Sequence, residues 1–125
     1  MGATHFYCTL NMKLNEIIQL TNARIVAGQN MDIGEIVAAY SSDLMSDVLT
    51  LDTERLLLIS GLANVQLIRT AEMADVAAVL LARGKTTSPE MIDMADKAGL
   101  VLLESPFSLF RASGILFAHG LYPVY

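Results

Sequence analysis

Cysteine, tryptophan and basic residues are scarce in this chain of 125 residues. The single cysteine, Cys8, excludes an internal disulfide, which is consistent with a reducing cytoplasm. Tryptophan is absent and aromatic residues make up 6%, so we expect no platform for stacking nucleic-acid bases. Lys and Arg number 8 against 13 Asp and Glu, a formal net charge of -5, which argues against a nucleic-acid-binding surface.

Long hydrophobic runs and targeting signals are also missing. The apolar runs, such as residues 98–103, are far shorter than the roughly 20 residues that a membrane-spanning helix needs. No basic stretch followed by an apolar run stands near residue 1, so a secretory signal is not predicted. The mean hydropathy of +0.49 is therefore attributed to many short buried segments, and we expect a cytoplasmic protein that contacts no membrane.

Residues 1–12 fit neither a helical nor a strand period. We interpret them as an irregular leader, either a natural extended start or an added extension, and an ordinary loose terminus is the alternative. Residues 13–125 contain no linker, internal repeat or low-complexity tract. A length of this order corresponds to one domain.

Short apolar segments alternate with amphipathic ones over residues 13–125. Strands are predicted at 23–27, 35–40, 56–60, 76–82 and 100–103. Helices are predicted with their starts at Asn15, at 41–43, at Val65, at 88–90 and at 105–106; the third ends at Met73, the fourth at Gly99 and the last near Gly120. This order predicts the α/β class: a single domain with a mostly parallel sheet built from βαβ units, and helices on both faces.

The last predicted helix is apolar on more than one face, so it must be buried on several sides. In a chain this short, one of those sides is expected to face another subunit, and we predict a homo-oligomer, most simply a dimer. The alternative is a helix enclosed between the sheet and a neighbouring helix. Its apolar residues are Phe107, Leu109, Phe110, Ile115, Leu116 and Phe117.

Small and hydroxyl-bearing residues follow the strands that are predicted to be parallel. Ligands of parallel sheets bind beyond the carboxyl ends of the strands, where helix N-termini offer N–H groups to anions. We therefore predict a small anionic metabolite or nucleotide as the ligand. The candidate ligand-binding residues are Ser41, Asp43, Gly61, Asn64, Arg69, Gly84 and Lys85.

Each candidate has a hypothetical role. Lys85 and Arg69 would supply positive charge, the glycines and Ser41 would supply backbone donors, and Asn64 would orient the ligand. The alternative interpretation is structural, because glycine and serine at these positions are also what helix caps and tight turns need.

Motifs of catalysis and metal binding are lacking. Gly84 and Lys85 resemble the end of a phosphate loop, but Val79 stands where that loop requires glycine. Asp43 and Asp47 could share a helix face and hold Mg²⁺, although exposed acids at this spacing are typical of a solvated surface. No nucleophile, base and orienting group stand at a recognised spacing. We expect no enzyme activity, no metal and no cofactor.

Five stretches of the sequence together resemble a known domain family. They are residues 40–48, 59–66, 69–73, 83–85 and 108–120. They resemble the small DRTGG domain, which also occurs beside CBS domains in some inorganic pyrophosphatases and in phosphate acetyltransferase-like proteins. They are also similar to the N-terminal, non-catalytic part of HPr kinase/phosphorylase. The resemblance covers nearly all of residues 12–121, although the five-letter signature is absent and residues 69–73 (RTAEM) are its nearest counterpart.

The resemblance implies a non-catalytic regulatory or ligand-sensing module with an α/β fold, of a kind that often associates with itself. It does not imply kinase activity, because it concerns the non-catalytic half and no kinase phosphate loop is present. A second hypothesis is a protein-interaction adaptor without a small-molecule site, which docks a separately encoded kinase or redox partner through its last helix. A deep pocket at the strand ends favours the sensor, and a flat surface with a large apolar patch favours the adaptor.

Overall fold

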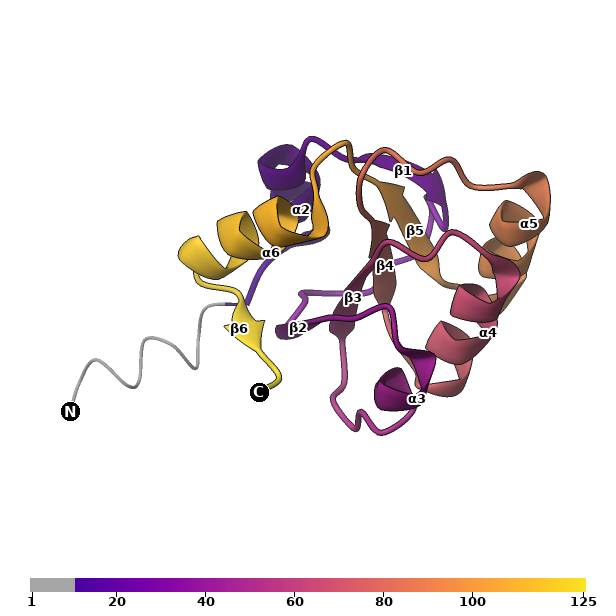
Figure 1. The fold of residues 1–125 in the computed structure, drawn as a ribbon, viewed down its shortest axis with the longest axis horizontal. Coiled ribbons are helices and arrows are strands. Elements are labelled where there is room, and N and C mark those ends of the chain that lie inside the picture. Colours follow the sequence, from indigo (N-terminus) through magenta and orange to yellow (C-terminus); the bar gives the residue numbers. More distant parts are fainter. Residues whose placement is uncertain (1–10) are drawn as a thin grey trace.

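A computed structural model describes residues 11–125, so most of the leader expected over residues 1–12 lies outside the described residues (Figure 1). The strands are β1 (Arg24–Ala27), β2 (Ala38–Ser41), β3 (Leu56–Ser60), β4 (Ala78–Leu81), β5 (Val101–Glu104) and β6 (Tyr122–Pro123). The helices are α2 (Leu14–Thr21), α3 (Met45–Val48), α4 (Val65–Met73), α5 (Pro89–Ala98) and α6 (Leu109–Ala118).

The strands form one sheet in the order β1-β5-β4-β3-β2-β6. The neighbours from β5 through β4, β3 and β2 to β6 pair in parallel, and β1 pairs antiparallel with β5. Helices α2 and α6 cover one face, and α3, α4 and α5 cover the other (Figure 1). The predicted fold class, an α/β domain with a mostly parallel sheet and helices on both faces, is confirmed.

Two apolar layers hold the helices to the sheet, because successive side chains of a strand point to opposite faces. One layer includes Leu58 of β3, Leu67 of α4 and Met91 of α5. The other includes Ile59 of β3 and Leu116 of α6. Strands β3, β4 and β5 are buried along their whole length, which explains their continuous apolar sequence.

The first described residues differ from the sequence-based prediction. Met12, expected at the end of an irregular leader, is buried in the core, and its backbone N–H donates to the carbonyl of Ile36 over 2.9 Å. The N–H of Ile36 donates back to the carbonyl of Met12 over 2.7 Å. Helix α2 begins one residue before Asn15, the predicted cap, and the carboxylate of Glu16 accepts from the backbone N–H of Lys13 at 3.3 Å.

The helix predicted to start at residues 41–43 is wrong in its start and length. Ser41 ends β2, because its strand continues in parallel register with β3 as far as Ile59. Helix α3 has only four residues. The hydroxyl of Ser42 accepts from the N–H of Leu44 at 2.9 Å, so this serine forms a turn before α3 and does not cap a long helix.

The end of the chain also departs from the prediction. Helix α6 is capped by Ser108, whose hydroxyl accepts from a backbone N–H three residues further on. The predicted start at residues 105–106 is therefore wrong, and the hydroxyl of Ser105 instead donates to the carbonyl of Thr21 over 2.6 Å. After α6 the chain adds β6, which was not predicted and which pairs with β2 at the edge of the sheet.

Candidate functional site

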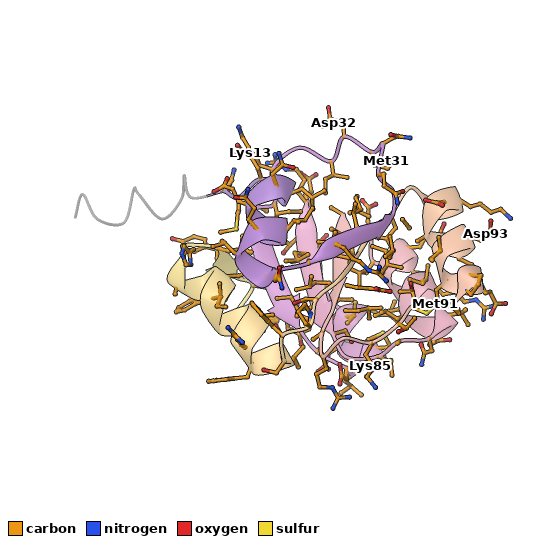
Figure 2. All side chains as sticks on the ribbon, turned by 90° about the horizontal axis from the view of Figure 1, so that it is seen from above. Lys13, Met31, Asp32, Lys85, Met91 and Asp93 are labelled. Atoms are coloured by element: carbon orange, nitrogen blue, oxygen red, sulfur yellow. The ribbon has the colours of Figure 1, made fainter. Side chains whose placement is uncertain are left out.

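The carboxyl ends of β2, β3, β4 and β5 lie at one edge of the sheet, which we call the carboxyl rim (residues 41–43, 60–64, 82–88 and 104–105). The register sets Ser41 beside Ile59 and Ser60 beside Leu81, so loops from adjacent strands leave the sheet about 5 Å apart. Figure 2 shows Lys85 at the edge opposite Met31 and Asp32. The topology thus brings Ser41, Gly61 and Gly84 to a common rim, while their role in binding stays a prediction.

Asp43 connects the loops after β2 and β3. Its Oδ1 accepts from the hydroxyl of Ser60 at 2.8 Å and from the N–H of Gly61 at 2.7 Å. The N–H of Gly84 donates to the carbonyl of Ser105 over 2.8 Å. Both glycine N–H groups that were predicted to bind an anion therefore already have acceptors within the chain.

Three helices of nine or ten residues, α4, α5 and α6, begin at or beside the rim. Each is capped by its own side chain, since Asn64, Ser88 and Ser108 accept from the backbone N–H three residues further on at 3.0 to 3.1 Å. Each cap satisfies one of the N–H groups that a helix start leaves without a partner. Asn64 therefore has a structural role in addition to the orienting role predicted for it.

Positive charge at the rim comes from Lys85 and from Arg83, which sequence analysis did not select. Among the residues that the structure describes, neither side chain forms an ion pair. Arg83 has a backbone φ of +65°, and its N–H donates to the carbonyl of Phe107 over 2.7 Å. The run Arg-Gly-Lys was the signal that could have identified Arg83.

Arg69 lies within α4, beyond the loops of the rim, and its role in binding stays a prediction. It is the fifth residue of α4, about 7.5 Å along the helix axis from the capping residue at a rise of 1.5 Å per residue. Its side chain is exposed and has no ion-pair partner in the described part of the chain.

Glu104, at the end of β5, is a buried carboxylate that the sequence analysis missed. Its Oε2 accepts from the N–H of Thr87 at 2.9 Å and from the Thr87 hydroxyl at 2.8 Å, and its Oε1 lies 2.8 Å from Nη2 of Arg24. Burial opposes ionisation, but these hydrogen bonds and the guanidinium outweigh it and hold the pKa of Glu104 below its usual 4.5. The carboxylate fixes the loop after β4 to both β5 and β1.

A pocket of about 410 Å³ lies between α6 and the β2–β6 edge. The hydroxyl oxygens of Ser41 and Ser113 are 2.6 Å apart within its lining. Ser41 thus lines this pocket, and none of the other six candidate residues does. The lining residues are Ala39, Tyr40, Ser41, Ile59, Phe110, Ser113, Gly114, Leu116, Phe117, Leu121, Tyr122, Pro123, Val124 and Tyr125.

Two tyrosines of the pocket lining pack against each other. The rings of Tyr40 and Tyr125 pack edge to face with centroids 6.0 Å apart. Partial desolvation raises the pKa of Tyr40 above its usual 10.0, and the carboxylate of Asp47 raises it further. Asp47, considered above with Asp43 for Mg²⁺, thus lies close enough to the Tyr40 hydroxyl for its charge to act on that group.

The described residues hold neither a cluster of metal-binding side chains nor a helix suited to a membrane. No three His, Cys, Asp or Glu side chains within residues 11–125 come together in a way that could hold a metal ion. None of the helices described here is long and apolar enough to cross a membrane.

No family model and no curated protein matches this sequence. The structure is similar to the CBS and DRTGG domains of the regulatory region of Clostridium perfringens pyrophosphatase, a structure that contains the activator diadenosine tetraphosphate. The TM-score is 0.71 at 16% sequence identity, and the match covers 86% of this chain and 47% of that chain. This similarity shows a CBS/DRTGG-like fold, in agreement with the fold expected from the sequence.

Proposed function

We propose that this chain is a non-catalytic regulatory module of the DRTGG family, which senses a small anionic metabolite or nucleotide in the cytoplasm and associates with itself. The observation that carries the proposal is the pair of cations Arg83 and Lys85, which flank Gly84 at the carboxyl rim without an ion-pair partner among the described residues. The pyrophosphatase region supports it, because that regulatory protein binds a nucleotide activator. The sequence supports the non-catalytic part, since no catalytic constellation stands at a recognised spacing.

The loop after β4 carries positive charge in an acidic chain. The net charge is -5, yet residues 83–85 carry two cations and no acid. The N-terminus of α5 follows in the same loop and adds the positive end of its helix dipole. Because the N–H groups of Gly61 and Gly84 are already bonded, the side chains of Arg83 and Lys85 must provide most of the attraction.

A ligand at this position can act as a signal because it contacts parts of the chain that come from separate strands. Phosphate groups held by Arg83 and Lys85 would lie beside Asn64 at the start of α4 and Ser88 at the start of α5. Asp43 and Glu104 already hold the neighbouring loops in place. Binding would then favour one arrangement of the associated subunits over another, which is regulation by population shift.

The test is a thermal-shift screen of the full chain against nucleotides and phosphorylated metabolites, followed by calorimetric titration of the compound that raises the Tm most. We expect Lys85→Ala and Arg83→Ala each to weaken binding about tenfold, as the loss of a charged hydrogen bond does. Arg69→Ala should have a smaller effect because of its distance along α4. Lys13→Ala, which removes an exposed cation of the α2 cap, is the matched control. A screen without any shift, or equal affinity in all four variants, would contradict the proposal.

A second candidate function is the adaptor that docks a separately encoded protein. The observation that favours it is the predominantly apolar lining of the pocket beside α6. The adaptor differs from the sensor in one outcome, because it predicts no melting shift with any small anion.

A further inference from the structure

The pocket beside α6 is lined in part by exposed aromatic side chains and by no charged residue. Phe110, Phe117 and Tyr125 are 89%, 66% and 84% exposed, and all three line the pocket. None of the residues that line it is Asp, Glu, Lys or Arg, although the chain as a whole is acidic. We call the aromatic surface the set of Phe110 and Phe117, with Ser113 and Gly114 between them on α6, and Tyr125, which packs against Tyr40.

The aromatic surface is large enough to form the centre of a protein interface. A fully exposed aromatic side chain presents about 200 Å², so the three rings present roughly 500 Å². A stable interface buries about 800 Å² on each partner, with an aromatic centre and a polar rim. The three rings would thus supply more than half of the area that one partner needs.

The order of residues along α6 favours a second copy of this chain as the partner. Phe110 and Phe117 lie on the same helical face as Ser113 and Gly114, which stand midway between them. Two helices related by a two-fold axis at this midpoint would pack Phe110 of one copy against Phe117 of the other. Since none of the lining side chains is Asp, Glu, Lys or Arg, this contact brings no like charges of the lining together, whereas contacts through acidic surface would repel a copy.

Gly114 gives an independent indication of close approach. It lies in the interior of α6, where glycine weakens a helix relative to alanine. A Cβ atom at this position would meet no other atom within 4 Å, so nothing in the described chain requires this residue to lack a side chain. The close approach of a second helix at this point would require a residue without a side chain.

We propose that α6 and the β6 edge form the interface of a homodimer, with Phe110, Phe117 and Tyr125 at its centre and Gly114 where the two helices cross. The inference rests on the self-association in the proposed function and assigns the surface that performs it. The partner is a second copy, and the interface is the same on both copies.

Sedimentation velocity of the full chain from about 1 to 100 μM tests the proposal. We expect a dimer for the natural sequence and a dimer Kd raised roughly thirtyfold or more by Phe110→Ser together with Phe117→Ser. The matched control is Met73→Ser, which removes a 74% exposed apolar side chain from α4 on the other face of the sheet. This control should leave the dimer Kd unchanged.

Gly114→Leu separates an interface from a merely structural role, because its two effects have opposite signs. Leucine favours the helix, so the Tm of the monomer, measured by dilution below the dimer Kd, should rise by about 2 to 4 °C. The same side chain blocks the crossing point, so the dimer should be lost at concentrations where the natural sequence is dimeric.

Two results would overturn the inference in distinguishable ways. A dimer that neither Gly114→Leu nor the double serine variant weakens would refute the surface but leave self-association standing. A monomer at every concentration would refute both the proposed surface and self-association. The ligand site would still be tested separately by the melting shifts of Lys85→Ala and Arg83→Ala.

Discussion

At the β1 edge of the sheet, the carboxylate of Glu104 accepts from Thr87 and pairs with Arg24, whereas at the β6 edge the rings of Phe110 and Tyr125 are mostly exposed. The polar side chains at the first edge thus bond to groups of the same chain. More generally, no buried side-chain N or O atom of the described residues lacks a hydrogen-bond partner. The second edge ends in a strand of two residues. The comparison teaches that the polar side chains at one edge have partners within this chain, whereas the exposed rings at the other edge are suited to a partner.

The largest expected effect is at the β1 edge. Gly28 follows β1 with a φ of +74°, and a Cβ there would lie 2.7 Å from the carbonyl oxygen of Leu100. We expect Gly28→Ala to lower the free energy of unfolding by about 3 kcal/mol, from backbone strain plus overlap, as measured by urea denaturation at a single low protein concentration.

Gly84→Ala is the matched control for this prediction. Gly84 has a similar φ of +66°, but a Cβ there would meet nothing within 4 Å. Backbone strain alone should cost about 1 kcal/mol. Equal losses in the two variants would show that the close approach of Gly28 to Leu100 adds nothing to the stability of this edge.

The next effect belongs to the buried carboxylate. Glu104→Ala leaves the N–H and hydroxyl of Thr87 without their acceptor, and we expect a loss of about 2 kcal/mol in the free energy of unfolding. The guanidinium of Arg24 is exposed, so its ion pair contributes only a small part. Asp52→Ala, at an exposed loop residue, should cost less than about 0.5 kcal/mol and is the control.

The same variant has a predicted pH dependence. The folded pKa of Glu104 lies below its usual 4.5, so its stabilisation is fully present above that value and is lost as the pH falls through the folded pKa. The difference in unfolding free energy between the natural sequence and Glu104→Ala should be constant from about pH 7 to pH 5.5 and should shrink below about pH 4.5. A difference that persists undiminished at about pH 3 would mean that the charge of Glu104 does not matter.

Features encoded in short segments were predictable from the sequence. The run at β3 is apolar because both of its faces are covered, and the serine–proline pair at Ser88 marks the start of α5. The antiparallel pairing of β1 and the addition of β6 were not predicted, since they depend on which strand lies beside them. Ser41 was assigned to a helix for the same reason, because only its register with Ile59 keeps it in β2.

The position of the candidate site in the fold was predictable from the sequence, but the hydrogen bonds that its groups form were not. Parallel strands suffice to bring Gly61 and Gly84 to one rim, as the sequence indicated. The acceptors that occupy their N–H groups, Asp43 and Ser105, come from other loops and carry no local signal. No local sequence signal indicates the role of Glu104, because this residue ends an apolar run and its partner Arg24 is 80 residues away in the sequence.

The smallest expected effect tests the β6 edge. Phe110→Ser should change the free energy of unfolding of the monomer by no more than about 0.5 kcal/mol, because an 89% exposed ring buries little surface within its own chain. Leu116→Ala, on the buried side of the same helix, should cost about 3 kcal/mol and shows that α6 itself is docked. Urea denaturation well below the dimer Kd measures both. If Phe110→Ser destabilised the monomer as much as Leu116→Ala does, the ring would belong to the chain's own core, and the β6 edge would need no partner.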